Sequence, residues 1–220
     1  MQSWKSPMAS LLMLLLPTLM ACRKGEEEPT EVADPVVEEI PITTASGAAL
    51  AEFEQGQRLM DVGRLQESRA HFESAVAQDS GFAYAYLNLN KTAQSAREFN
   101  DNLQQAVAHV AGKSDGERLL IEIQRTTFDN NATARIELAR ELVEKYPHSP
   151  RAWLELARIQ GEQNQHRAAR ESLRQAQELD PKLAATHFAT WASFLFNEPK
   201  DFARAEAAMQ ASLEIVPDEA

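Results

Sequence analysis

Histidine and cysteine are the side chains here most able to do chemistry, because they titrate or bind metals near neutral pH. Helical zinc and di-iron sites place them at close spacings such as Glu-x-x-His or His-Glu-x-x-His. No histidine in the sequence has such a neighbour, and there is no Gly-x-Ser-x-Gly elbow or phosphate-binding loop. The sequence therefore predicts no enzyme, no metal and no cofactor. The histidines are His71, His109, His148, His166 and His187.

The single cysteine, Cys22, ends an N-terminal segment with the features of a targeting sequence. Lys5 precedes an apolar run, Met8–Met20, which is shorter than the ~20 residues that a membrane-spanning helix needs. The run leads into Leu-Met-Ala-Cys at 19–22, which resembles a bacterial lipobox. This resemblance implies that residues 1–21 are a lipoprotein signal peptide and that Cys22 is the site of lipid attachment. An ordinary secretory signal and an uncleaved anchor are the alternatives.

A lipidated Cys22 would fix the protein to a membrane. Several acyl chains, at ~0.8 kcal/mol per buried methylene group, make a firm anchor. Arg23 and Lys24 follow, without the aspartate that retains enterobacterial lipoproteins at the inner membrane. The resemblance therefore implies a lipid-anchored protein of the bacterial cell envelope, at the outer membrane and facing the periplasm.

Residues 22–47 are predicted to be an acidic tether that lacks regular structure. Acidic side chains outnumber basic ones in this segment, and prolines stand at positions 29, 35 and 41. Low apolar content with net charge favours disorder, and proline favours an extended chain of ~3.1 Å per residue. The tether would hold the folded part away from the membrane.

From residue 48 onward the sequence repeats a helical pattern. Three segments carry a small residue, a large residue four positions later, a second small residue three further on, and a turn residue five beyond that. This spacing puts the side chains on one face of a helix, where the small ones allow a neighbouring helix to approach closely. The sets are Ser68, Phe72, Ala75, Ser80; Ala169, Leu173, Ala176, Pro181; and Ala205, Met209, Ser212, Pro217.

The pattern resembles the tetratricopeptide repeat (TPR), a helix-turn-helix unit of about 34 residues. Trp153, Leu156 and Ala157 carry the clearest match, and Gly56 occupies the close-contact position of the first unit. The resemblance implies an all-α fold, an α-α superhelix forming a TPR solenoid over residues 48–220. Arg135 departs from the pattern, since a small residue is expected there. The five hairpins are expected at 49–80, 83–111, 115–147, 150–181 and 183–217.

The expected partner is another protein. The net charge of -11 disfavours nucleic acid, because phosphates need a basic surface. The TPR resemblance implies a concave wall, lined by the first helix of each hairpin, that binds a peptide or protein. A basic clamp for a C-terminal carboxylate is not reproduced, since Gln57 and Glu155 stand where basic or amide groups would matter. The expected wall residues are Phe53, Gln57, Leu87, Lys91, Leu120, Gln124, Arg151, Leu154, Arg158 and Phe188.

These observations predict a lipid-anchored TPR scaffold or adaptor of the bacterial cell envelope, which mediates protein–protein interaction and does no chemistry of its own. One alternative is an envelope carrier that binds a small molecule or glycan through the aromatic residues of 188–196. Another is an accessory subunit of an envelope enzyme. Solenoids usually finish with a polar capping helix, and the sequence has three residues after Pro217. The expectation is that the C-terminal edge binds another molecule, that it self-associates, or that the chain is shorter than its relatives.

Overall fold

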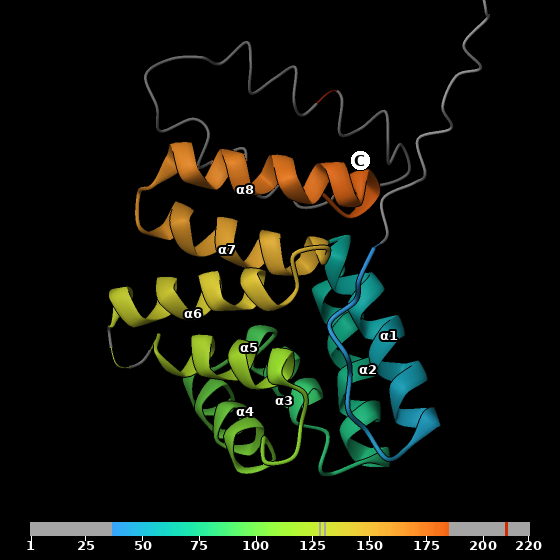
Figure 1. Ribbon diagram of the computed structural model, residues 1–220. Coiled ribbons are helices and arrows are strands. Elements are labelled where there is room, and N and C mark those ends of the chain that lie inside the picture. The colour runs from blue at the N-terminus through green and yellow to red at the C-terminus, as the bar shows by residue number, and fades with distance from the viewer. Residues whose placement is uncertain (1–36, 128, 130, 185–209, 211–220) are drawn as a thin grey trace, which may run out of the picture. The chain divides into compact units, whose positions relative to one another are not determined.

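The computed structural model describes residues 37–127, 129, 131–184 and 210. The chain divides into two compact units, Met1–Asp34 and Pro35–Ala220, and every described residue belongs to the second unit. No helix among the described residues is both long and apolar enough to cross a membrane. The helices are α1 (Gly47–Asp61), α2 (Leu65–Gln78), α3 (Ala83–Lys91), α4 (Ala96–Ala108), α5 (Asp115–Arg125), α6 (Ala132–Lys145), α7 (Pro150–Glu162) and α8 (His166–Leu179) (Figure 1).

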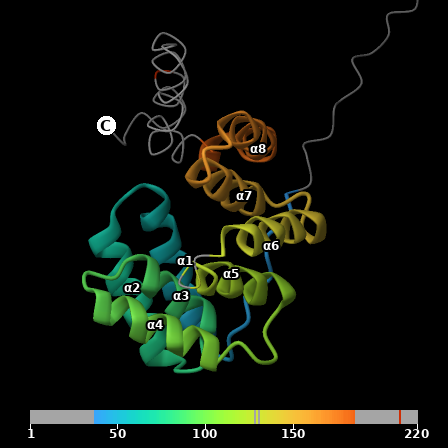
Figure 2. The same cartoon turned by 90° about the vertical axis from the view of Figure 1, so that its left-hand side faces the viewer.

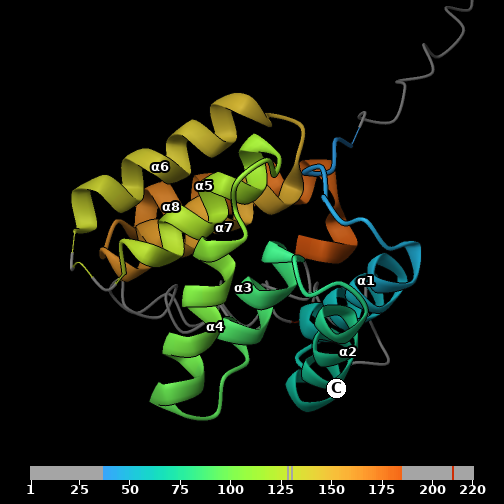
Figure 3. The same cartoon turned by 90° about the horizontal axis from the view of Figure 1, so that it is seen from below.

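Consecutive helices pair into hairpins: α1 with α2, α3 with α4, α5 with α6, and α7 with α8. Figures 1 and 2 show α5, α6, α7 and α8 as successive layers of one stack. Seen from below, α3 lies between the α1–α2 pair and α5 (Figure 3), and it contacts both α2 and α5. This arrangement confirms the all-α fold class and the first four expected hairpins. Apart from residues 183, 184 and 210, the fifth expected hairpin (183–217) lies outside the described residues.

The small residues of the repeat pattern are buried in the first and fourth hairpins, at Ser68 and Ala75 on α2 and at Ala169 and Ala176 on α8. Gly56 on α1 faces Phe72 on α2 so closely that a Cβ atom at Gly56 would lie 2.7 Å from the ring. Phe72 is fully buried, and Leu173 on α8 is 1% exposed. The third set of the pattern, at Ala205, Met209 and Ser212, lies outside the described residues.

Two hairpin turns share one left-handed backbone position. Gly63 between α1 and α2 has φ 77°, and Asn164 between α7 and α8 has φ 61°. In both turns the next residue donates its N–H to the carbonyl five positions earlier, over 2.9 Å at Arg64 and 2.8 Å at Gln165. Glycine and asparagine tolerate this conformation best, which explains their use here.

The segment 38–46, which we call the strap, is packed against the helices. Sequence composition predicts a disordered tether here. Residues 38–46 form no helix or strand, as expected, but they are held against the folded part. Ile40 is only 3% exposed, and the N–H of Glu38 donates to the carbonyl of His148 over 3.0 Å. The strap is drawn in blue ahead of α1 in Figure 1. Its order comes from contacts with residues about 35 to 110 positions later, which local composition cannot reveal.

Candidate functional site

A pocket of about 330 Å³ opens among the strap, α1, α3, α5 and α7. We call it the charged pocket, because ionised side chains surround an apolar interior. Its volume lies at the lower end of the range for ligand-binding clefts, ~300–1,000 Å³. The lining residues are Ile40, Gln57, Met60, Asp61, Tyr84, Asn88, Lys91, Leu120, Arg151, Leu154, Glu155, Arg158 and Glu162.

Helical spacing brings these side chains to the pocket. Residues three or four positions apart share one face of a helix, so each first helix presents a short series of them. On α7 the series is Arg151, Leu154, Glu155, Arg158 and Glu162, and it forms much of the wall. Within the described part of the chain, each hairpin contributes through its first helix, and the strap adds Ile40.

At one side of the pocket Arg151 on α7 holds Asp61 at the end of α1. The guanidinium donates two hydrogen bonds to the carboxylate, of 3.0 and 2.6 Å. The side chains are 21% and 10% exposed, and Glu39 of the strap lies 3.8 Å from Arg151 Nε. Burial alone would lower the pKa of Arg151, but the bonded charge of Asp61 outweighs it and raises that pKa. Two parallel hydrogen bonds of this kind fix the orientation of the guanidinium relative to the carboxylate as well as their separation.

A second charge cluster centres on Glu155. Its carboxylate accepts hydrogen bonds from Arg158, one of them 3.2 Å long, and Lys91 Nζ lies 3.9 Å away. The Glu155 side chain is 10% exposed. Burial alone would raise the pKa of Glu155, but the charges of Arg158 and Lys91 hold it at about 2. Burial lowers the pKa of Lys91, with Glu155 opposing the shift.

Arg135 on α6 extends this cluster. It replaces the small residue of the repeat pattern, and its side chain reaches across to Glu162 on α7. Glu162 also accepts a 2.5 Å hydrogen bond from Arg158. Burial and the charge of Arg158 lower the pKa of Arg135. Among the described residues, nothing accepts a hydrogen bond from Arg135 Nε.

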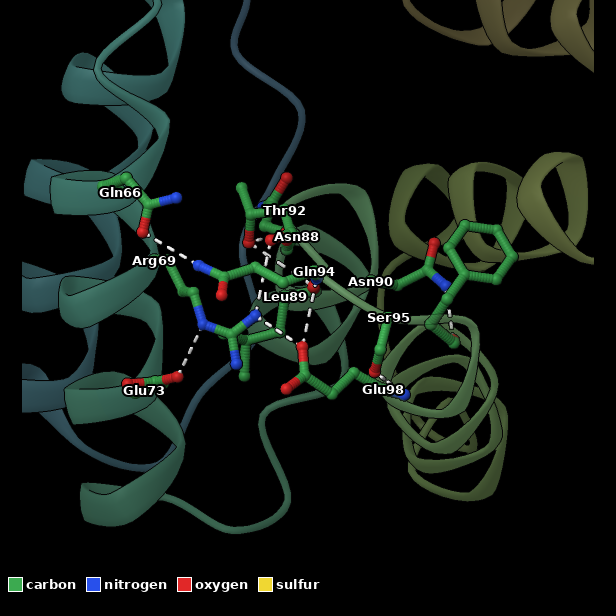
Figure 4. A network of polar contacts seen from close by, with 11 residues as sticks. Gln66, Arg69, Glu73, Asn88, Leu89, Asn90, Thr92, Gln94, Ser95 and Glu98 are labelled. Atoms are coloured by element: carbon green, nitrogen blue, oxygen red, sulfur yellow. Dashed lines mark hydrogen bonds and ion pairs between the residues drawn. The ribbon is translucent and has the colours of Figure 1, made fainter.

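A separate polar network fixes the position of α3, which carries Lys91 (Figure 4). Arg69 on α2 donates to the carbonyl of Thr92 over 3.3 Å and to Glu98 over 2.9 Å. Its Nε donates to Glu73 over 2.8 Å. The network thus joins the end of α3 to α2 and α4, and holds Lys91 at the pocket.

The predicted wall residues divide into two groups. The pocket lining includes Gln57, Lys91, Leu120, Arg151, Leu154 and Arg158. The others do not line it. Phe188 lies outside the described residues, and Gln124 is 9% exposed on α5, away from the lining.

The expectation that Phe53 and Leu87 line the wall is wrong, since both are fully buried and belong to the core. Phe53 packs against the rings of Phe82 and Tyr84, with centroids 5.0 Å apart in each case. It shares a helical face with Gln57, but it lies one turn earlier on α1, where α3 covers that face. Packing between hairpins therefore decides which residues of the face remain open.

The acidic side chains of the pocket are not among the expected wall residues, and the sequence singles out Glu155 only as a departure from the carboxylate clamp. Glu155 and Glu162 lie four positions after Arg151 and Arg158, so the i,i+4 spacing of opposite charges was a usable signal. No spacing in the sequence places Ile40 at the pocket, because it belongs to the strap and not to a helix. Within the described residues, no group of three His, Cys, Asp or Glu side chains could hold a metal ion.

Comparison with known proteins adds the following. No curated protein sequence matches the chain. A TPR protein, YrrB, whose structure is described as having an unusual peptide-binding site, is 18% identical, with 77% of this chain and 87% of that one covered at a TM-score of 0.38. The MamA protein is 13% identical, with 78% and 93% covered at a TM-score of 0.39. Residues 150–183 match the family model of the tetratricopeptide repeat. Arg151, Leu154, Glu155 and Arg158 therefore lie on the first helix of a tetratricopeptide repeat.

Proposed function

We propose that this chain is a lipid-anchored TPR scaffold of the bacterial cell envelope, which binds a protein partner in the charged pocket and does no chemistry of its own. The observation that carries the proposal is the convergence of Gln57, Lys91, Leu120, Arg151, Leu154 and Arg158 on one pocket. These residues come from α1, α3, α5 and α7, so a partner seated there touches every described hairpin.

The chemistry of the pocket suits a segment of a protein. Met60, Leu120 and Leu154 offer apolar surface for one inserted side chain. Charges of both signs surround them, because Lys91 and Arg158 stand beside Glu155. A peptide whose apolar residue is flanked by charged residues would satisfy both features, since side-chain pockets provide the specificity of peptide binding.

Site-specific photo-crosslinking in cells tests the pocket. A photoreactive residue placed at Met60, which lines the pocket, should form one discrete adduct with a protein partner. The same residue at Leu65 on α2, which is 50% exposed and absent from the lining, should not form that adduct. Lys91→Ala should weaken the Met60 adduct at least fivefold, whereas Arg97→Ala, at a 91% exposed side chain, should leave it unchanged. Identical adducts from both positions, or none from Met60, would contradict a pocket-bound partner.

The anchor is tested separately through Cys22. Replacing it with serine removes the acceptor thiol, so the protein should move from the membrane fraction to the soluble fraction and lose incorporation of a radiolabelled fatty acid. Density-gradient separation of the wild type should place it with outer-membrane markers. Membrane retention of Cys22→Ser would refute lipid anchoring without affecting the pocket.

The other roles depend on residues outside the described part of the chain. The aromatic residues at 188–196 are the basis for a small-molecule or glycan carrier, and the C-terminal edge is the basis for self-association. Sedimentation at high micromolar concentration checks the latter, because a clean monomer would remove it. No contact among the described residues favours an enzyme-accessory role over a scaffold.

A further inference from the structure

The arm of the strap, residues 38–43, is held in the manner of a bound peptide. Its main chain makes four hydrogen bonds to the rest of the fold. The Glu38 N–H donates to the carbonyl of His148 over 3.0 Å, and Ser114 Oγ donates to the carbonyl of Pro41 over 2.8 Å. Two more join Thr43 to α5 and the loop before it: its N–H donates to Glu117 Oε1 over 3.0 Å, and its carbonyl accepts from Lys113 Nζ over 3.2 Å. Main-chain bonds of this kind hold an extended segment, as in peptide-recognition domains.

A fitted cavity receives one side chain of the arm. Ile40 is 3% exposed and lies against Gly116, where a Cβ atom would come within 2.4 Å of Ile40 Cγ2. The Gly116 N–H donates to the hydroxyl of Tyr146 over 3.1 Å, which fixes the aromatic wall of this cavity. Ile42, two residues on, packs against the core and is partly buried. Alternate side chains thus enter the fold, as expected for an extended ligand.

The strap divides into an arm and a root. At the root, Asp79 accepts hydrogen bonds from Thr44 Oγ1 over 2.5 Å and from the Ala45 N–H over 3.1 Å. Ser46 then caps α1 by accepting from the Ala49 N–H. None of these root contacts involves residues 38–43, so release of the arm leaves the start of α1 in place.

The groove is less stable when it is empty than when a segment occupies it. Glu117 is fully buried, and its carboxylate accepts from the Ser114 N–H as well as from the strap at Thr43. Removing the arm without replacement takes away one of these bonds, and a buried polar group that loses its partner is costly. An incoming strand that restores the bond is therefore favoured over an empty groove.

We propose that Lys113–Glu117 and the turn 146–148 form an extended-peptide-binding groove, which the chain's own arm occupies and which a strap-like segment supplied in trans can enter by displacing it. The segment it accepts is extended and presents Ile-Pro-Ile, with both isoleucines turned inward. Because Ile40 also lines the charged pocket, exchange of the arm reshapes one wall of that pocket. The groove and the charged pocket share Ile40, but the proposal does not require that a partner occupy the pocket.

The proposal predicts that the chain's own arm competes for the groove with a separate peptide of the same sequence. A tethered arm acts at an effective concentration of the order of millimolar, which suppresses binding of the same sequence in trans. Ile40→Asp places a charge in an apolar cavity and should release the arm, because burying an unpaired charge is strongly unfavourable. Val37→Asp is the matched control, since Val37 precedes the arm and is 42% exposed.

The test uses a labelled synthetic peptide of residues 36–46 and the full-length chain in detergent micelles, followed by fluorescence anisotropy. The peptide should bind the Ile40→Asp chain at least tenfold more tightly than the wild type, and the Val37→Asp chain should behave as the wild type. A peptide that itself carries Asp at position 40 should bind the Ile40→Asp chain at least tenfold more weakly. Equal binding to all three chains, or equal binding of both peptides, would overturn the proposal.

A second variant guards against misfolding. Ile40→Ala empties the cavity without introducing charge, so it should raise peptide binding to a smaller extent while the thermal transition is retained. Hydrogen exchange at the chain's own Glu38 and Thr43 amides should accelerate in this variant, and it should accelerate further when the added peptide displaces the arm. Unchanged exchange in Ile40→Ala, with no gain in peptide binding, would also overturn the proposal.

Discussion

Arg151 and Asp61 are 90 positions apart in the sequence, yet they form a two-point ion pair of 3.0 and 2.6 Å at the edge of the charged pocket. The pair joins the end of α1 to the start of α7, so it connects the first hairpin to the fourth. Solenoid repeats contact mainly their neighbours in sequence. This pair and the strap add contacts of longer range, which fix the pocket's walls relative to one another.

Arg151→Ala should therefore destabilise the fold by about 3 kcal/mol, the lower end for breaking a buried pair, because Arg151 keeps 21% of its side chain exposed. The cost arises from removing the two hydrogen bonds that Arg151 donates to the largely buried carboxylate of Asp61. Urea unfolding at pH 7 measures it. Arg97→Ala is the control, since Arg97 pairs with Asp101 on the surface at 91% exposure, and it should change the free energy by less than about 0.5 kcal/mol. Equal effects would contradict a structural role for the Arg151 pair.

The pH dependence of stability should report on Glu155. Its pKa is about 2 in the folded chain, below the ordinary 4.5, so the unfolded chain binds its proton first as pH falls. The stabilisation is fully present above pH 4.5 and is lost as pH falls from 4.5 through 2. Urea unfolding of the wild type and Glu155→Gln at pH 7, 4 and 3 isolates this effect from that of other acids, such as Asp79. The difference between the two proteins should shrink on acidification, and a constant difference would be inconsistent with the lowered pKa.

Repeat spacing predicts the hairpins, because helical periodicity determines which side chains share a face. The resemblance to the tetratricopeptide repeat implies six of the pocket residues. Repeat spacing does not predict that Phe53 and Leu87 are buried, since this depends on how the hairpins pack, with Phe53 lying against the rings of Phe82 and Tyr84. The strap could not be predicted either. Its order depends on the space left by Gly116, 76 positions after Ile40, and on hydrogen bonds to residues 113–117 and 148. The composition of residues 38–46 alone does not indicate these distant contacts.

The left-handed turns provide a prediction about local structure. Gly63→Ala should cost about 1 kcal/mol or more, because a Cβ atom disfavours the φ of 77°. Asn164→Ala at the equivalent turn should also destabilise, since alanine lacks the tolerance of asparagine for φ 61°. Gly47→Ala is the control: no atom lies within 4 Å of a Cβ there and its φ is not positive, so stability should stay the same or rise. Thermal unfolding compares the three variants, and a loss in Gly47→Ala as large as in Gly63→Ala would contradict the assignment to backbone conformation.

Replacement of Arg135 should change the stability far less than replacement of Arg151, although both are arginines in ion pairs. Arg135→Ala restores the small residue of the repeat pattern and removes a buried Nε for which no acceptor lies among the described residues. Glu162 keeps the 2.5 Å hydrogen bond from Arg158, so no carboxylate is left unpaired. A poorly satisfied buried charge adds little to stability, and its replacement is often neutral or favourable. The free energy of unfolding in urea at pH 7 should therefore change by less than about 1 kcal/mol. Arg140→Ala, at an exposed position on α6, controls for the loss of a helical arginine. A destabilisation equal to that of Arg151→Ala would show that Arg135 holds α6 against α7.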